Sequence, residues 1–482
     1  MSINKEVQKI ININIINIFI ILICFLANFT GGFKYIIYIP ILLVYFFYLL
    51  KKNEVTIILY QLYMMILNEF ILDNIFHYIR IDTPLELKYI TEFISVILII
   101  KILLNKNKYD NLIKNKVIVA TLIISIINTA IVIINNESIL QLINSLRIYF
   151  RFIPVYLVIR YNKIDFKISY RLLYFASIMV FSIQVLLNFH RDFRTGIFGI
   201  IGASVFSVFM SIKVIDLTVK FIINKETNKS KLIFFALLTF VIFALAESKA
   251  FIVILSISMI TILILSKGNV IKRLFFTIIT VGFLLLGVNL MVKIYPHFSY
   301  FLSIENLRDN VEQYIFGNSN AVSFSMGRFE AMTYIGNMEQ NTLDKKVFGL
   351  GAGVAMPPEN LFYINDASGK KIIDFPESRI FKSYDKRYGY YLSAFTTIYL
   401  DNGYIGIVIL ISIFTIILLK SIYLIRYGKT VDSKSLGGIS IFIVFASVFC
   451  CFYGSDLFYR NYNYMLCIIS ALVSKNFKEK IR

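Results

Sequence analysis

Apolar residues dominate the chain in long runs, and short clusters of polar and charged residues separate one run from the next. Runs of this length match the thickness of a lipid bilayer when they fold as α-helices. The pattern therefore predicts an all-α polytopic membrane protein. We expect about fourteen transmembrane helices, at residues 8–28, 33–50, 55–72, 89–104, 116–134, 139–159, 171–189, 197–219, 232–247, 250–266, 274–292, 391–419, 437–454 and 462–474.

One hydrophilic segment breaks this pattern. Residues 293–390 form a stretch of 98 residues with eleven basic and eleven acidic side chains. A structureless connection of that length is uncommon, so we expect a small, mainly helical cap that carries part of the function. The chain then divides into residues 1–292 with the first eleven spans, the large loop at 293–390, and residues 391–482 with the last three spans and a tail.

The basic residues indicate how the chain is oriented. The sequence has 49 Lys and Arg against 29 Asp and Glu, a formal charge of +20. The short loops on the side of the two termini hold 27 of these cations, and the opposite short loops hold seven. By the positive-inside rule both termini are cytoplasmic and the large loop is extracytoplasmic. The positive charge is thus a topology signal, and no nucleic-acid partner is predicted.

Composition excludes an ordinary soluble protein and gives no sign of a metal or cofactor. Apolar residues make up 58% of the chain, and its mean hydropathy is +0.74. The three His are far apart in sequence, and all four Cys lie inside apolar runs without metal-binding spacing. We predict packing roles for these cysteines, which are Cys24, Cys450, Cys451 and Cys467.

Two arginines stand inside a predicted span, where a charge is expensive. Arg147 and Arg151 are four residues apart on one helix face, about 12 and 18 Å below the outer end at 1.5 Å per residue. They cannot face lipid. Either they form an internal salt bridge with an acid such as Glu69 or Glu92, or they bind an anionic headgroup drawn in from outside.

Three further cations are predicted at the outer membrane surface, namely Arg194, Lys249 and Arg328. Singly, each is typical of a solvated loop. Together, beside an apolar bundle and under a hydrophilic cap, they favour a site for a lipid-linked diphosphate, because Arg and Lys are the usual phosphate-binding side chains. In the large loop, the stretch FGLGAG predicts a turn in which Gly349, Gly351 and Gly353 bring backbone close to another group, and we predict that these glycines bind substrate.

Five short stretches follow one another between residues 190 and 410. They are RTGIFG, ALAESKAFIVIL, GRFEAMTYIGN, KKVFGLGAG and TTIYLDNGYIGIVIL, the last of which places Asp401, Gly403 and Gly406. In this order they resemble the O-antigen polymerase and O-antigen ligase family, integral membrane enzymes that process undecaprenyl-diphosphate-linked glycans.

The resemblance implies roles for some of these residues. Lys249 and Arg328 match positions where the family places basic residues that hold the donor diphosphate, and Arg194 lies in a matching outer loop. Members of the ligase branch usually have a His shortly before the acidic-x-Gly element, whereas this chain has Tyr391 and Ser393 there. That departure favours the polymerase branch.

The predicted function is a metal-independent glycosyltransferase that joins lipid-linked oligosaccharide repeat units on the outer face of the bacterial cytoplasmic membrane. Glu330 and Asp401 are candidate general bases, with a cap-surface charge and a helix cap as the respective alternatives. No cofactor is expected. The partners implied are the undecaprenyl-diphosphate-linked glycans, membrane lipids, a chain-length regulator and a flippase. The alternatives are an O-antigen ligase and a lipid-linked oligosaccharide flippase, which would need no large cap.

Overall fold

All regular secondary structure in the described residues is helical. The computed structural model describes residues 2–28, 34–71, 86–105, 108–109, 116–187, 189, 194–199, 203–223, 229–246, 248–267, short pieces between 277 and 293, 328–356, 378–388, 393–454 and 456–481. The predicted span at 274–292 lies largely outside these residues, as do large parts of the predicted cap.

Five helical segments within the described residues are long and apolar enough to cross a membrane, so a multi-pass membrane protein is the class that the structure supports. They are Lys5–Ala27, Ile139–Tyr161, Lys167–Leu186, Ala394–Tyr427 and Val431–Phe452. Shorter apolar helices lie at Lys34–Leu50, Ile118–Ile134 and Ala250–Leu265.

The helices follow the apolar runs closely. They are α1 (Ser2–Asn28), α2 (Lys34–Leu50), α3 (Glu54–Glu69), α5 (Glu86–Leu104), α6 (Lys116–Ile134), α7 (Ile139–Phe150), α8 (Ile153–Tyr161), α9 (Lys167–Leu186), α10 (Ala203–Ile223), α11 (Lys229–Leu245), α12 (Lys249–Leu265), α16 (Arg328–Glu339), α17 (Leu343–Phe348), α18 (Arg379–Tyr388), α19 (Ala394–Tyr427), α20 (Val431–Tyr453) and α21 (Arg460–Ile481), with short 3₁₀ turns η5 (Gly196–Phe198) and η7 (Asp456–Phe458).

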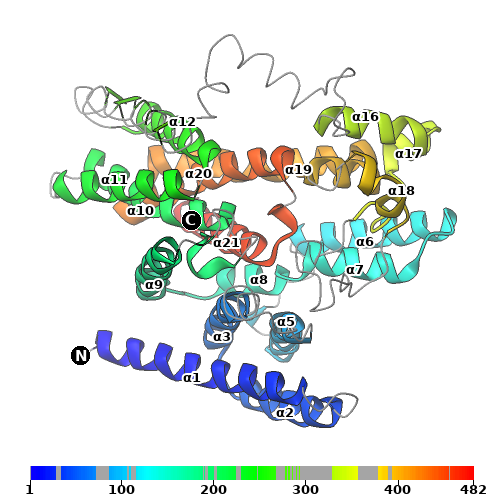
Figure 1. The fold of residues 1–482 in the computed structure, drawn as a ribbon, viewed down its shortest axis with the longest axis horizontal. Coiled ribbons are helices and arrows are strands. Elements are labelled where there is room, and N and C mark those ends of the chain that lie inside the picture. The colour runs from blue at the N-terminus through cyan, green and yellow to red at the C-terminus, as the bar shows by residue number, and fades with distance from the viewer. Residues whose placement is uncertain are drawn as a thin grey trace.

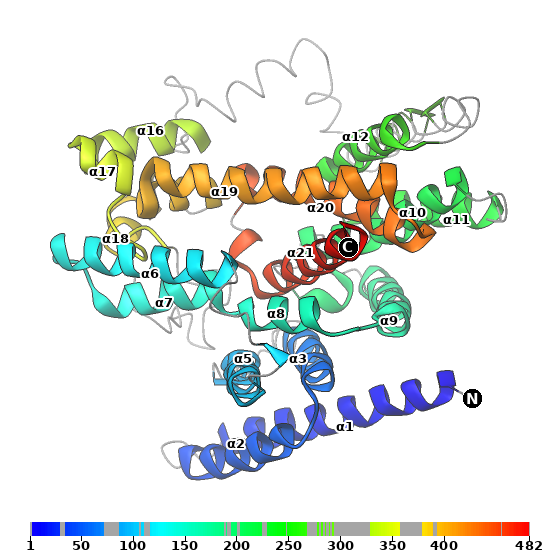
Figure 2. The ribbon, with the colours of Figure 1, turned by 180° about the vertical axis from the view of Figure 1, so that it is seen from behind.

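A long helical hairpin organises the molecule. Helices α19 and α20 lie side by side, joined by a short turn at 428–430 (Figure 1). Helices α10, α11 and α12 gather near one end of this hairpin, and α16 to α18 gather at the other end of α19. Helices α1 and α2 form an outer layer, and the view from behind shows the same order (Figure 2). Helices α3, α5 and α9 are seen nearly end-on, so they run across α19.

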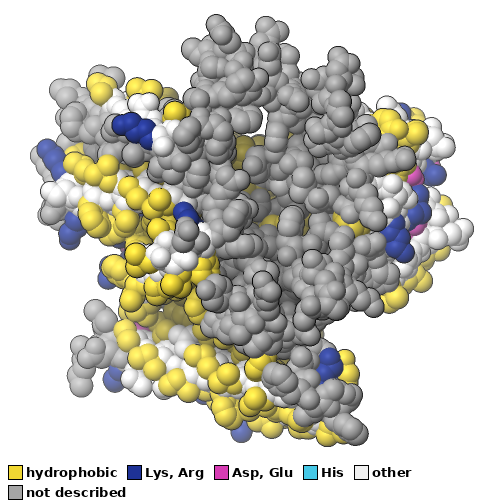
Figure 3. Space-filling model, in the orientation of Figure 1, with side chains coloured by type: hydrophobic (Ala, Val, Ile, Leu, Met, Phe, Trp, Pro, Cys, Tyr) yellow, Lys and Arg dark blue, Asp and Glu magenta, His cyan; other side chains and the backbone are white. Residues whose placement is uncertain are grey.

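The outside of this assembly is apolar over wide areas, as Figure 3 shows along α1 and α2. Leu186 is 83% exposed and Ile134 is 76% exposed. Contiguous apolar surface of this kind is rare on soluble monomers and suits contact with lipid chains. The helix surfaces therefore agree with a membrane environment.

Two predicted spans differ from a single straight helix. The span predicted at 139–159 breaks between α7 and α8 at Arg151 and Phe152, where Pro154 occupies the first turn of α8 and removes a backbone donor. The span predicted at 391–419 extends to Tyr427 as α19, and its backbone is non-helical at Gly403, with φ 60° and ψ −159°. Both breaks lie beside the candidate site.

Candidate functional site

The described part of the large loop folds into a helical cap made of α16, α17, the glycine turn at residues 349–356, and α18. We call it the outer cap because the loop charges predict that it is extracytoplasmic. Its core contains the buried side chains of Ala331, Ile335, Leu350, Ile380 and Phe381. Leu400 of α19 belongs to the same cluster, so the cap is packed onto the first turns of α19.

The glycine turn fits against the membrane helices backbone to backbone. Gly349 and Gly353 have φ values of 83° and 96°, a region that favours glycine. A Cβ at Gly349 would lie 2.3 Å from the carbonyl oxygen of Asp401, and one at Gly353 would lie 2.3 Å from that of Gln141 on α7. These glycines thus approach protein backbone at close range.

The other glycines of this contact also have protein atoms at close range, one of them a side chain. A Cβ at Gly351 would lie 2.6 Å from the side chain of Val132 on α6, and one at Gly403 would lie 2.4 Å from the carbonyl oxygen of Val347. KKVFGLGAG and the acidic-x-Gly element, two of the stretches that carry the family resemblance, therefore pack against each other, although about 50 residues separate them in the sequence.

Asp401 holds the glycine turn in place. The residue is fully buried. Its Oδ2 accepts a hydrogen bond from the Gly353 backbone N–H at 2.9 Å, and its Oδ1 accepts one from the Ala355 N–H at 2.7 Å. Its carbonyl oxygen accepts a third from the Gly351 N–H at 2.9 Å, and the hydroxyl of Tyr149 lies nearby. With both carboxylate oxygens engaged, this geometry favours an anchor for the glycine turn over a base. The predicted helix-capping role is wrong, because the N-cap of α19 is Ser393 and Asp401 lies inside the helix.

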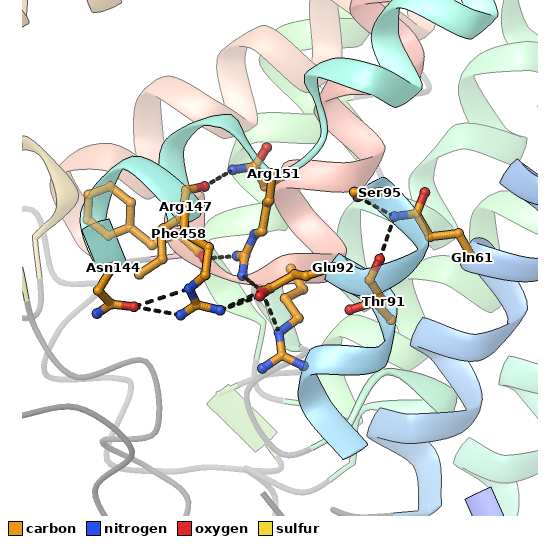
Figure 4. A network of polar contacts seen from close by, with 11 residues as sticks. Gln61, Thr91, Glu92, Ser95, Asn144, Arg147, Arg151 and Phe458 are labelled. Carbon is orange, nitrogen blue, oxygen red and sulfur yellow. Dashed lines mark hydrogen bonds and ion pairs between the residues drawn. The ribbon is translucent and has the colours of Figure 1, made fainter. Parts of the chain in front are cut away.

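A cluster of arginines lies on the neighbouring face of α7 (Figure 4). The Nη1 atom of Arg147 is 2.6 Å from each carboxylate oxygen of Glu92 on α5. Its Nη2 and Nε donate to Oδ1 of Asn144 at 2.7 and 3.2 Å, and its guanidinium lies 5.0 Å from the ring centre of Tyr89. The predicted internal salt bridge is thus present, and Glu92 is its acid.

Two more arginines converge on the same carboxylate. Nη1 of Arg151 is 3.4 Å from Glu92 Oε1, and its Nη2 donates to the carbonyl oxygen of Phe458 in η7. Nε of Arg460 is 4.0 Å from Glu92 Oε1. The exposed fractions of the Arg151, Arg460 and Arg147 side chains are 1%, 7% and 18%. These four side chains, which we call the arginine cluster, sum to a formal charge of +2.

The arginine cluster and the glycine turn share one helical turn of α7. Ile148 packs in a single apolar cluster with Met356 at the end of the glycine turn, with Ala394 and Ile398 of α19, and with Phe458. The two arginines of α7 flank Ile148 and point to α5 and η7, whereas Ile148 faces the cap. One short segment therefore links the charged site to the outer cap.

The predicted outer cations are only partly within the described residues. Arg194 donates from Nε to the Phe189 carbonyl at 2.8 Å and from Nη1 to the Leu245 carbonyl at 3.3 Å. It therefore bridges to the end of α11, at the turn that leads to Lys249. Lys249 and Arg328 begin α12 and α16, but their side chains, and that of Glu330, lie outside the described residues.

Sequence reasoning placed Arg147, Arg151 and Glu92 in one region but missed Arg460, which it counted only as an outer-loop cation. The sequence contains a signal that Arg460 belongs to this region, because the residue stands at the start of a helix directly after a short turn. Searches against protein-family models and against curated proteins found no match to this chain. Within the described residues, no three His, Cys, Asp or Glu side chains are grouped to hold a metal ion.

Proposed function

We propose that this protein is a polysaccharide polymerase that joins lipid-linked oligosaccharide repeat units outside the bacterial cytoplasmic membrane. The observation that carries the proposal is the arginine cluster beside the glycine turn. Stretches that resemble one glycan-assembly family meet there, within one helical turn of a group of guanidiniums. The resemblance supplies the substrate class, and the charges supply a reason for its binding.

The arginine cluster suits a diphosphate group. Its four side chains sum to a formal +2 in a partly buried setting, where fields are less screened than in water. Arg147 is the most exposed of its arginines, with 18% of its side chain accessible, so it is our candidate for direct contact with the donor. Arg151 and Arg460 act behind it as fixed charges.

In the proposed reaction, a hydroxyl group at the non-reducing end of one repeat unit attacks the anomeric carbon of the donor chain. A bond forms between the acceptor oxygen and that carbon, and the bond from the carbon to the diphosphate oxygen breaks. The lipid diphosphate leaves with the electron pair, and the hydroxyl proton is released to water. Because the leaving group is already activated, the protein's tasks are to bind charge and to align the acceptor. We expect no metal requirement.

The proposal includes the finer topology, with about fourteen spans, cytoplasmic termini and the outer cap outside. A reporter fused at Asp344, which is fully exposed on α17, should report the extracytoplasmic side. A reporter at Lys429, in the turn between α19 and α20, should report the cytoplasm. A cytoplasmic signal at Asp344 would overturn the orientation and the proposed function with it.

The decisive assay uses purified protein in detergent with undecaprenyl-diphosphate-linked repeat units and no nucleotide or ion gradient. Chains of several repeats should form, because the energy is stored in the glycosyl diphosphate bond, and a chelator should not stop their growth. Unchanged repeat units together with their movement across sealed vesicles would instead identify a flippase.

The same assay tests the arginine cluster. Arg147→Gln should slow chain growth about tenfold or more, as the loss of one charged donor commonly does, and Arg147→Lys should restore part of the rate. Arg379→Gln is the matched control. Arg379 also forms ion pairs, with Glu137 and Glu339, but at the cap surface, where 46% of its side chain is exposed. Equal rates for Arg147→Gln and Arg379→Gln would exclude the cluster as the donor site.

A further inference from the structure

A cavity of about 440 Å³ lies between α3, α9, α10, α20 and α21, and no residue of the glycine turn lines it. Its volume is within the range of small-molecule sites. Most of its wall is apolar, with Met65, Leu173, Phe209, Leu436 and Met465 among the lining residues. An apolar cavity of this size is a poor place for water and a good one for a hydrocarbon chain.

Most charged residues of the cavity wall come from segments that we predict to be cytoplasmic, namely Asp165, Lys167 and Arg171 around the start of α9, Lys220 in the last turn of α10 and Asp432 at the start of α20. Lys213 and Asp216 lie deeper, in the middle of α10 and within the predicted span at 197–219. The wall thus has apolar and charged regions, which is the pattern of a site for an amphiphile whose head lies at the membrane surface.

We call the charged end of this cavity its mouth. Some of the charged side chains at the mouth form ion pairs, and others do not. Nζ of Lys167 is 2.8 Å from Asp432, and Nζ of Lys220 is 2.8 Å from Asp216. Among the ion pairs that the described residues form, none includes Arg171 or Lys213. The Lys213 ammonium lies 5.6 Å from the ring centre of Phe235.

Lys213 is also within electrostatic reach of several other cations. The cations Arg171, Lys220 and Lys231 are close enough to repel it, and the Asp216 carboxylate, which is itself paired with Lys220, is close enough to attract it. An anion placed between Lys213 and Arg171 would relieve this repulsion and could accept charge-assisted hydrogen bonds. The mouth is therefore complementary to a phosphate rather than to a cation.

We propose that this cavity binds one acyl chain of an anionic phospholipid of the cytoplasmic leaflet, with the lipid phosphate at Lys213 and Arg171. The inference does not depend on the proposed polymerase activity, because it rests on a separate cavity, but it shares the predicted orientation, which assigns the cavity to the cytoplasmic leaflet. It makes the protein a specific binder of anionic lipid.

The absence of tryptophan from the chain allows a direct test in lipid bilayers. Leu436→Trp places a single fluorophore in the cavity wall, and Phe209→Trp is a second reporter in case the first does not fold. Phe234→Trp is the control, because Phe234 on α11 is 60% exposed and faces bulk lipid. Each variant is reconstituted with brominated phosphatidylglycerol or brominated phosphatidylcholine, which quench nearby tryptophan.

The cavity reporter should be quenched by brominated phosphatidylglycerol at a mole fraction about tenfold lower than by brominated phosphatidylcholine. Both lipids carry the phosphate, but the choline ammonium of phosphatidylcholine adds a positive charge beside Lys213 and Arg171, whereas phosphatidylglycerol keeps its net negative charge. The Phe234→Trp control should show no preference. Adding Arg171→Ala and Lys213→Ala to the reporter should remove the preference. Lys163→Ala should keep the preference for phosphatidylglycerol, because Lys163 is an exposed cation in the loop before α9 and does not line the cavity.

Three results would overturn the inference. Equal quenching of the cavity reporter by the two lipids would show that the mouth does not select an anion. A preference that survives the loss of Arg171 and Lys213 would place the headgroup elsewhere. Competition by inorganic phosphate at the ionic strength of the control buffer would identify a free-anion site instead of a lipid site.

Discussion

Replacing Asp401 by Asn is the most informative single change in the glycine turn, because it keeps the size of the side chain and removes one acceptor. The carboxylate accepts two backbone N–H groups, from Gly353 at 2.9 Å and from Ala355 at 2.7 Å. An amide can accept only one of these bonds, and its NH₂ group then faces the other backbone donor. The second N–H is left buried without an acceptor.

The magnitude follows from these two contacts. A hydrogen bond to a charged group contributes about 1.5–3 kcal/mol, and an unsatisfied buried donor costs about 1–3 kcal/mol. The lost hydrogen bond and the unsatisfied donor describe partly the same loss, so their free energies do not add in full. We therefore expect Asp401→Asn to lower the free energy of unfolding by about 2–4 kcal/mol. For a chain of this length, that corresponds to a fall in Tm of about 2–4 °C.

The four cysteines make the measurement practical. Cys24, Cys450 and Cys451 are buried and Cys467 is half-buried, so a thiol-reactive dye reports unfolding in detergent. Asp432→Asn is the control. Its ion pair with Lys167 is 57% and 59% exposed, which limits its contribution to about 1 kcal/mol. Equal shifts in Tm for the two variants would refute the anchoring role. Unchanged Tm with lost activity in Asp401→Asn would identify Asp401 as a base.

Three further predictions use the same protein. Gly353→Ala should prevent assembly of the outer cap and expose it to protease, whereas Gly282→Ala should be silent, since a Cβ there has nothing within 4 Å. Glu92→Gln should lower the free energy of unfolding by about 3–5 kcal/mol in the thiol-dye assay, because it leaves guanidiniums buried without their carboxylate; a shift below 1 kcal/mol would contradict this. Burial, together with the hydrogen bond to Glu339, raises the pKa of Tyr384 to about 12, so its contribution to cap stability is complete below pH 10 and is lost as the pH rises from 10 to 12. Tyr384→Phe should remove that part of the pH dependence of protease resistance.

Hydropathy located most of the described helices because apolar length is a strong signal. The run predicted at 116–134 is α6, Lys116–Ile134, and the run at 33–50 is α2, Lys34–Leu50. Hydropathy does not show in which direction a helix runs relative to its neighbours. Helices α3, α5 and α9 run across α19, and neither the apolar runs nor the loop charges could have predicted that crossing, since both give only length and sidedness.

The glycine turn was predicted in kind but not in partner. The sequence FGLGAG indicates that backbone must come close to something. What it meets, namely Asp401 of α19 and Gln141 of α7, depends on tertiary contacts between residues far apart in sequence. Only the family resemblance connected Asp401, about 50 positions later, with this turn.

The side chains of the arginine cluster differ in burial, and this difference separates a structural role from the proposed role in donor binding. Arg151, with 1% of its side chain exposed, binds both Glu92 and the backbone of η7, so it fixes α5, η7 and the end of α7 relative to one another. Arg147 binds the same carboxylate but keeps 18% of its side chain accessible. An incoming diphosphate can therefore share Arg147 while Arg151 still holds Glu92. Binding of the donor at this site would then require no rearrangement of the bundle, only a second acceptor for one guanidinium.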